Sequence, residues 1–315
     1  MSKARQNTLP TKPVPLRPMI KYRGGKQREI AQYEKFIPRD FDTYFEPFFG
    51  GGATFFHIRP ERAVIGDINQ PLMDFYSGVR NHYRELSDEL AELQAIYEAN
   101  QRDYEERKSR HPRRRIRNAN EELYYNLRDQ YNGLAQQTYS AAALYFFINK
   151  TSYSGMIRYN ADGHFNVPFG RYVHLNTNGV TREHSQLLRR AEILVADYEE
   201  SFVRAGRNDF MYLDPPYDCI FNDYGNLELD EGFNEAAHRR LAALFRELKC
   251  RALMVIGRTS LTQELYGDLV KFQYDKTYAV NIRNRFRSEA VHYGNAYTIK
   301  ELWVCATARK DSETV

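Results

Sequence analysis

The sequence predicts an α/β fold in which a sheet domain is interrupted by a helical module. Short apolar segments that end in an acid or a glycine, such as residues 63–67 and 253–257, are typical of strands buried in a sheet. Consecutive glycines at residues 50–52 follow another such segment and precede a helical one. Residues 81 to about 132 instead carry a long, charged helical pattern. Because no internal repeat or low-complexity tract suggests an array, we expect one discontinuous α/β domain with an insertion.

The first part of the sheet domain is expected at residues 19–71. Residues 1–18 are polar and proline-rich, so we expect a loose arm there, with the fold starting near Met19. Residues 43–46 predict a strand, residues 54–57 a helix after the glycine turn, and residues 63–67 the next strand.

The insertion is expected at residues 72–185. Its long helical pattern is marked by leucine and isoleucine at three- and four-residue spacing, namely Leu86, Leu90, Leu93 and Ile96. Residues 141–149 predict an apolar helix. Residues 151–172 are rich in glycine, asparagine and tyrosine and predict a β-hairpin, with Asp162 and Gly163 as its turn.

The second part of the sheet domain is expected at residues 186–310, and residues 311–315 form a tail. Strands are predicted at residues 193–195, 211–213, 253–256 and 302–306. Asn234 is placed to cap a helix at residues 235–249. The first two of these strands lead into Asp197 and Asp214. Ligands of open α/β sheets bind at the carboxyl ends of strands, so we expect these carboxylates near a site.

The composition is that of an ordinary globular protein. With 315 residues, of which 42% are hydrophobic, the chain can bury a sizeable core. No run approaches the roughly 18 apolar residues of a membrane span, and the polar start lacks the apolar centre of a signal peptide, so we expect a cytoplasmic protein. Cys219, Cys250 and Cys305 lack metal-ligand spacing. We therefore expect reduced thiols and no metal site.

Positive charge is clustered, although the formal net charge is only +4. Residues 107–117 contain seven Lys or Arg and no acid, and Arg283, Arg285 and Arg287 alternate further on. Basic runs are often only solvated surface. The 24 Tyr and 19 Phe nevertheless favour a nucleic-acid partner, because aromatic rings beside basic clusters suit stacking on unpaired bases.

The tetrapeptide Asp214, Pro215, Pro216 and Tyr217 can bind a flat ring that carries an amino group. The prolines end the preceding strand because they lack an N–H and restrict the backbone before them. A carboxylate and a proline carbonyl that accept both N–H bonds of an aromatic amine favour a more tetrahedral nitrogen, whose lone pair points toward an electrophile. Tyr217 would stack on the ring. The alternative is an Asp-capped turn with a buried tyrosine.

A glycine turn and a distant carboxylate indicate a nucleotide-like cofactor. Consecutive glycines let the backbone of residues 46–52 approach a ligand, and Asp67 lies about 20 residues further on, where a carboxylate can bind ribose hydroxyls. Tyr22 and Lys26 can add an aromatic edge and an ammonium that pairs with a cofactor carboxylate, although the alternative is a tight turn with solvated lysines. The turn lacks a P-loop pattern, which disfavours an NTPase. An adenosine cofactor that carries a carboxylate points to S-adenosylmethionine.

These motifs and their order resemble those of the DNA adenine methylase (Dam) family of N6-adenine methyltransferases, the D12 class, in which the recognition domain lies between the cofactor and catalytic motifs. The resemblance covers most of the chain and rests on residues 21–26, 46–52, 67–69, 149–172 and 214–217. It implies a Rossmann-like S-adenosylmethionine-dependent methyltransferase sheet. It also implies an inserted helical target-recognition domain that carries a β-hairpin.

The resemblance also implies roles for individual residues. The residues expected to contact S-adenosylmethionine are Tyr22, Lys26, Glu46, Pro47, Phe48, Gly50, Gly52, Asp67, Ile68, Asp197, Tyr198 and Asp214. The substrate adenine would be flipped out of duplex DNA, held through its amine by Asp214 and the Pro215 carbonyl, and stacked on Tyr217. Methyl transfer would then be a direct in-line displacement without a metal or a covalent intermediate.

The hairpin resembles the DNA-reading element of the family. The residues expected to contact DNA are Lys21, Tyr153, Ser154, Met156, Arg158, Asn160, Pro168 and Arg171. Arg158 would bond a guanine in the major groove and Lys21 another guanine, while Tyr153 would wedge into the base stack. Met156 and Pro168 would contact a thymine methyl group. This pattern is compatible with the sequence GATC, although Ser154 and Met156 differ from the commonest family residues.

The expected function is site-specific adenine methylation of double-stranded DNA. The expected setting is a restriction-modification system with a cognate restriction endonuclease, a phage, or housekeeping methylation, with the enzyme a monomer or weak dimer. Residues 107–117 would contact phosphates outside the target site. The alternatives are a methyltransferase that acts on RNA adenine or a protein amide, and a DNA-binding regulator without turnover. The regulator would be marked by a broken tetrapeptide or glycine turn, and both are intact.

Overall fold

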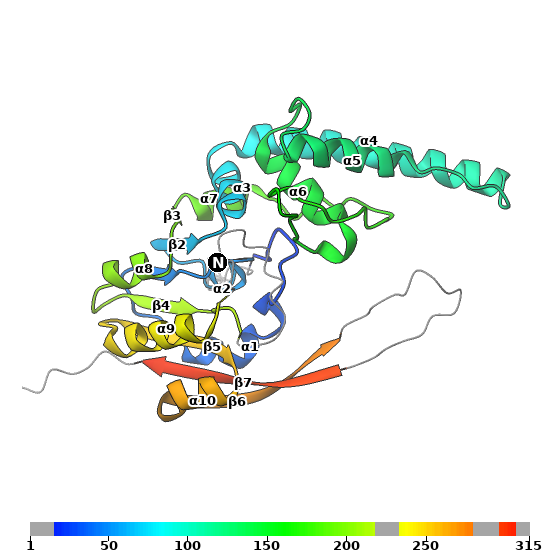
Figure 1. Ribbon diagram of the computed structural model, residues 1–315. Coiled ribbons are helices and arrows are strands. Elements are labelled where there is room, and N and C mark those ends of the chain that lie inside the picture. The colour runs from blue at the N-terminus through cyan, green and yellow to red at the C-terminus, as the bar shows by residue number, and fades with distance from the viewer. Residues whose placement is uncertain (1–15, 218–232, 280–295, 307–315) are drawn as a thin grey trace, which may run out of the picture.

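A mostly parallel sheet forms the centre of the protein (Figure 1). The computed structural model describes residues 16–217, 233–279 and 296–306. Within these residues, seven strands pair in the order β3-β2-β1-β4-β5-β7-β6. The strands are β1 (Tyr44–Glu46), β2 (Ala63–Asp67), β3 (Ala191–Val195), β4 (Phe210–Leu213), β5 (Arg251–Gly257), β6 (Val270–Ala279) and β7 (Ala296–Ala306). β1 to β5 are parallel, whereas β7 is antiparallel to both β5 and β6. The Rossmann-like α/β prediction is confirmed.

The direction in which strands are added reverses at β1. β2 and then β3 follow on one side of β1, whereas β4 and then β5 lie on the other. Such a reversal leaves a crevice outside the carboxyl ends of the central strands. The topology therefore places the ends of β1 and β4 where a ligand is expected.

Alternate strand residues contribute to two apolar cores, one on each face of the sheet. Tyr44 of β1 belongs to the larger core, which includes residues of α2 (Ala53–Ile58). Its neighbour Phe45 belongs to the other core, with residues of α9 (Glu235–Glu247) and α10 (Ser260–Tyr266). Successive side chains of a strand point to opposite faces, so burial on both faces explains the continuous apolar runs of the sequence.

Several elements match the expected positions closely. β2 has the predicted bounds, and β1 lacks only the first residue of its prediction. The Asn234 side chain accepts a hydrogen bond of 3.0 Å from Ala237 N and so caps α9 as expected. The sequence did not predict β6, α7 (Arg182–Leu188), α8 (Glu199–Arg204) or α10.

The expected helical pattern after the first strands is divided among separate helices. They are α3 (Gln70–Asn81), α4 (Tyr83–Arg110) and α5 (Ala119–Tyr131), followed by α6 (Ala141–Thr151). α3 begins before the predicted start because the Asn69 side chain accepts a hydrogen bond from Leu72 N at 3.1 Å. α4 and α5 lie side by side and extend away from the sheet, while α6 packs against α3, α4 and α5 (Figure 1).

The prediction of a regular β-hairpin at residues 151–172 was wrong in its secondary structure. Two isolated antiparallel bridges, Ser152 to Phe169 and Tyr159 to Phe165, replace continuous strands. Tyr153–Gly155 forms a 3-10 turn, and Pro168 cannot donate a ladder hydrogen bond, which accounts for the interruption. The chain still doubles back through the expected turn, because Gly163 N donates to Asn160 O at 3.0 Å.

Other sequence predictions concern membrane spans, cysteines and metal sites. No helix among the described residues is long and apolar enough to cross a membrane. Cys250 is a buried free thiol, and no group of metal-ligating side chains occurs within the described ranges. Several predictions lie outside the described residues: residues 1–15 of the arm expected at residues 1–18, Cys219, and the alternating arginines 283, 285 and 287.

Candidate active site

Three carboxylates meet at one edge of the sheet. Glu46 and Asp67 are the last residues of β1 and β2, and Asp214 directly follows β4. Because these strands are parallel neighbours in the order β2-β1-β4, their carboxyl ends lie together. Glu46 and Asp67 are buried, whereas 22% of the Asp214 side chain is exposed. Asp214 is therefore the carboxylate of the three that is most open to a ligand.

Lys26, near the start of the described chain, contacts two residues of the tetrapeptide at residues 214–217. Its Nζ lies 2.9 Å from Asp214 Oδ1 and donates to the Tyr217 hydroxyl at 2.5 Å. Only 3% of the Lys26 side chain is exposed. A buried ammonium requires such partners, since an isolated charge in this setting is strongly disfavoured. The sequence assigned Lys26 to a cofactor, Asp214 to both the cofactor and the substrate, and Tyr217 to the substrate, and Lys26 contacts the other two.

The glycine turn is held by Asp67. Gly50 N donates to Asp67 Oδ2 and Asn69 N donates to Asp67 Oδ1, both at 3.0 Å. Burial raises the pKa of the Asp67 carboxyl, and these backbone N–H groups oppose that effect. The Tyr76 hydroxyl donates to Gly50 O at 2.9 Å. Backbone N–H groups of Gly50, Ile68 and Asn69 thus hold the Asp67 carboxylate, which in turn fixes the turn.

Gly50 also lies directly under the ring of Tyr22. Its φ is +48°, and a Cβ added to it would stand 2.6 Å from the Tyr22 ring. Gly52 has a φ of +64° and leaves similarly little room beside Phe49. Both positions require glycine for conformation and for space. The sequence prediction of a close backbone approach is therefore consistent with the geometry, and Tyr22 is the neighbour that approaches.

Glu46 is buried beneath this turn. Its Oε2 accepts a hydrogen bond from the Tyr44 hydroxyl at 2.7 Å. Burial raises the pKa of the Glu46 carboxyl well above its usual range, and the Tyr44 bond lowers it by a smaller amount. Pro47 is also buried, whereas Ile68 is half-buried. Glu46 and Pro47 therefore lie further from solvent than Asp214.

An aromatic group adjoins the turn on the other face of the sheet. The rings of Phe48 and Tyr198 are stacked with centroids 5.1 Å apart, and Phe233 meets Phe48 edge-on. Arg240 donates to the Tyr198 hydroxyl at 3.0 Å and lies 3.5 Å from Asp197 Oδ2. Tyr198 is buried and Asp197 is exposed. Tyr198, a predicted cofactor contact, thus lies beside Phe48 of the predicted glycine turn.

Lys21 connects this edge of the sheet to the helical module. Its backbone N–H donates to Asn149 Oδ1 and its carbonyl accepts from Asn149 Nδ2, both at 2.8 Å. Lys21 Nζ donates to Lys150 O at 2.8 Å and lies 3.7 Å from the centre of the Tyr172 ring. Burial and the nearby charge of Lys150 lower the pKa of Lys21 to about 8. Lys21 is therefore anchored beside the doubled-back segment.

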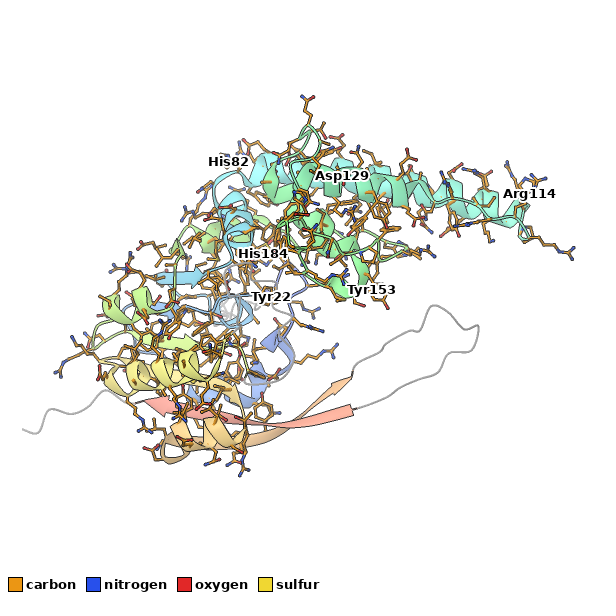
Figure 2. The ribbon with its side chains drawn as sticks, viewed as in Figure 1. Tyr22, His82, Arg114, Asp129, Tyr153 and His184 are labelled. Carbon is orange, nitrogen blue, oxygen red and sulfur yellow. The ribbon has the colours of Figure 1, made fainter. Side chains whose placement is uncertain are left out.

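The predicted DNA-reading residues lie along residues 151–172 with different exposure. Arg158 is exposed, and its Nε donates to Asn166 Oδ1 at 2.7 Å. Arg171 is exposed and lies 3.8 Å from Glu121. Ser154 is exposed with φ +56°, Asn160 belongs to the turn, and Tyr153, Met156 and Pro168 are half-buried. Figure 2 shows Tyr22 and Tyr153 on the side of the helical module nearer the sheet.

A family model decides which enzyme class carries this arrangement. The model of the D12 class of N6 adenine-specific DNA methyltransferases matches residues 22–282, which is most of the chain. The chain belongs to this D12 class. It is an adenine-specific DNA methyltransferase, and DNA is its substrate.

Similar proteins include other DNA methyltransferases. "Type II methyltransferase M.CviBI" of Paramecium bursaria Chlorella virus NC1A is 32% identical over 85% of this chain and 94% of its own. "Type II methyltransferase M.MjaIII" of Methanocaldococcus jannaschii is 30% identical over 88% of this chain and 97% of its own. A "DNA adenine methylase" of Haemophilus influenzae is 27% identical over 80% of this chain and 83% of its own.

Some supporting residues of this D12 methyltransferase were missed by sequence reasoning. Tyr76 hydrogen-bonds the glycine turn, and Arg240 hydrogen-bonds Tyr198. Asn149 and Tyr172 both contact Lys21. Asn149 carried a usable signal, because it is a polar residue in an otherwise apolar helix and is buried. Arg240 carried none, because its position on α9 resembles any exposed helical arginine. A methyltransferase of this class requires a methyl donor.

Proposed function

We propose that this enzyme transfers a methyl group from S-adenosylmethionine to N6 of an adenine that is flipped out of duplex DNA. The observation that carries the proposal is the contact of Lys26 with both Asp214 and Tyr217 at the sheet edge that also holds Gly50 and Asp67. This contact brings the predicted cofactor and catalytic groups into one site. A donor and an acceptor bound there would be neighbours, as direct transfer requires.

The residues at this edge fit S-adenosylmethionine. The glycine turn brings its backbone and the Tyr22 ring close together, and the Asp67 carboxylate at the end of β2 is proposed to accept ribose hydroxyls. Phe48 and Tyr198 offer ring faces, and Lys26 offers an ammonium for the carboxylate of the donor. The Tyr22 ring packs against Gly50 and covers the turn. When bound, S-adenosylmethionine supplies an electrophilic methyl group.

Asp214 and Pro215 are proposed to prepare the substrate nitrogen. The Asp214 carboxylate and the Pro215 carbonyl accept the two N–H bonds of the adenine amine, so that its lone pair turns toward the methyl group. Asp214 would then stabilise the positive charge that develops on the nitrogen as the carbon–sulfur bond of the donor breaks, and the nitrogen would afterwards lose one N–H proton to solvent through Asp214. Tyr217 provides the ring on which the flipped base stacks. Lys26 contacts Asp214 through Oδ1, so Oδ2 is proposed as the acceptor for the amine.

Residues 72–185 are proposed to form the target-recognition domain, which projects from the sheet as α4, α5 and the segment 151–172 (Figure 1). Arg158, which Asn166 orients, is proposed to read a guanine, and Lys21 a second one. Tyr153 would enter the base stack, and Met156 with Pro168 would meet a thymine methyl. We propose GATC as the recognised sequence. The type II names of two relatives support a restriction-modification role.

Labelled S-adenosylmethionine tests this proposal directly. The purified enzyme is supplied with unmethylated duplexes that contain GATC or a scrambled site, and the modified base is mapped. We expect N6-methyladenine in the GATC duplex, and none with Asp214→Ala. Asp88→Ala, which alters an exposed carboxylate on α4, should retain activity. Equal activity of Asp214→Ala would contradict the catalytic assignment, and methylation of another sequence would contradict GATC alone.

A further inference from the structure

The end of the helical module carries charge that methyl transfer does not use. α4, α5 and the loop between them, residues 111–118, form an arm, and residues 107–117 are its tip. The arm extends away from the sheet, and Arg114 lies at its far end (Figures 1 and 2). An α-helix rises about 1.5 Å per residue, so the 28 residues of α4 span about 42 Å.

Polar contacts fix the path of the arm. Asn118 Nδ2 donates to Gln101 Oε1 at 2.9 Å, and Asn120 Nδ2 donates to Tyr97 O at the same distance. At the tip, Lys108 Nζ donates to the carbonyls of Pro112 and Arg114, both at 3.2 Å. The loop is therefore held by its backbone and by Lys108, and its arginine side chains are not needed for its conformation.

Positive charge at the tip is concentrated in the loop. On α4, Arg107 pairs with Asp103 at 3.1 Å, and Arg110 pairs with Glu106. The loop arginines are all exposed and make no ion pair within the described residues; they are Arg113, Arg114, Arg115 and Arg117. Four like charges in one short loop repel each other. An anionic partner would relieve this repulsion.

We propose that the arm tip binds the phosphate backbone of the substrate duplex at a distance from the methylated site. The inference rests on the proposed function, in which the helical module binds duplex DNA. Guanidinium groups suit phosphate oxygens, and the DNA bound at the active site presents phosphates at high local concentration. At about 3.4 Å per base pair, a reach of 42 Å corresponds to about 12 base pairs. The tip contact is independent of base sequence.

Binding measured against duplex length and salt tests the inference. Arg113, Arg114, Arg115 and Arg117 are all changed to glutamine. The matched control makes the same change at four exposed arginines elsewhere, at positions 39, 62, 84 and 182. Each protein is titrated with duplexes that carry the recognised site and either about 4 or about 16 flanking base pairs on each side, and methylation of the short duplex is measured in parallel.

We expect the wild type and the control to bind the long duplex more tightly than the short one. The tip variant should lose this difference. Its plot of log affinity against log salt on the long duplex should be shallower by about 2 to 4, since each lost phosphate contact removes about 0.9. Methylation of the short duplex should continue in all three proteins.

Other results would overturn the inference without touching the proposed function. If the tip variant retains the wild-type length dependence and salt slope, the tip does not bind flanking DNA, and its partner is another polyanion or solvent. An equal loss in the control would mean that net charge alone is responsible. Failure of the wild type to methylate any duplex would instead contradict the proposed function, whatever the binding curves show.

Discussion

Lys26 Nζ lies 2.9 Å from Asp214 Oδ1, so the proposed catalytic carboxylate is neutralised by a buried ammonium. The same ammonium donates to the Tyr217 hydroxyl. A cation thereby occupies acceptors that lie beside the proposed binding place of the adenine amine. Under the proposed function, a donor carboxylate would offer Lys26 a second partner and would free Asp214 Oδ1. We therefore expect binding of the donor and binding of the base to be coupled through Lys26.

Lys26→Met should destabilise the protein by about 1–3 kcal/mol. Removing one partner of a buried pair leaves the other charge uncompensated, and the partial exposure of Asp214 reduces that cost. Urea unfolding of Lys26→Met, Asp214→Asn and the double variant measures the effect. The double variant should be more stable than the sum of the single losses predicts. If the losses of the two single variants simply add, Lys26 and Asp214 do not interact in the way expected. Asp103→Asn, which alters an exposed pair, serves as the control.

Gly50→Ala should weaken S-adenosylmethionine binding at least tenfold. The added methyl group would stand 2.6 Å from the Tyr22 ring, and the φ of +48° adds about 1–2 kcal/mol of backbone strain. Gly133→Ala is the matched control, because Gly133 has a φ of +72° with no atom within 4 Å of the added Cβ. Calorimetric titration with the cofactor separates the two. Equal binding by both variants would show that Tyr22 can move aside freely.

The groups at the strand ends that form the candidate site have local signals in the sequence. The bounds of β2, the glycine turn and Asp214 after β4 follow from short apolar runs, glycines and prolines. The contact of Lys26 with Tyr217 could not be predicted, since the two residues are 191 positions apart and meet only when β1 and β4 pair. Tertiary context decides such contacts.

The conformation of residues 151–172, the proposed recognition element, was harder to predict. Its composition and its turn at Gly163 indicated a hairpin, and the chain does double back there. Regular strands are absent from it because side chains of the module replace ladder hydrogen bonds. Asn132, for example, accepts from Phe165 N at 2.8 Å and donates to Phe165 O at 3.0 Å. The strand propensity of a segment does not predict a hydrogen-bond partner from a neighbouring helix.

DNA affinity should fall as the pH rises above about 8. Burial and the charge of Lys150 lower the pKa of Lys21 to about 8, so Lys21 of the free enzyme loses its positive charge as the pH rises past 8. Bound DNA favours the protonated form of Lys21, so binding weakens as that form is lost. Anisotropy titrations from pH 7 to 9.5 measure the effect. Lys21→Gln should bind more weakly, with a flatter pH profile. A wild-type profile as flat as that of the variant would contradict the role of Lys21.

The same titration has the opposite effect on folding stability. The folded-state pKa of Lys21, about 8, lies below its usual value of 10.5. Between these values the unfolded chain binds more protons, so the contribution of Lys21 to the free energy of unfolding rises with pH. Urea unfolding of the wild type and Lys21→Gln at several pH values isolates this contribution. A difference between them that stays constant with pH would contradict the lowered pKa.

Arg158→Ala should relax the choice of one base pair. The Arg158 side chain is oriented by Asn166 and exposed, so its guanidinium can present donors to a guanine, a contact worth about 1–3 kcal/mol of discrimination. Arg171→Ala should instead lower activity evenly on all sequences, because we expect the exposed Arg171 side chain to contact phosphate, and a phosphate contact carries no base information. Values of kcat/KM on duplexes with single substitutions in the site distinguish the two. Asn166→Ala should lie between wild type and Arg158→Ala, since it removes the orienting bond and keeps the guanidinium. If Arg158→Ala reduces activity equally on every duplex, Arg158 contacts the backbone and the base is read by another residue.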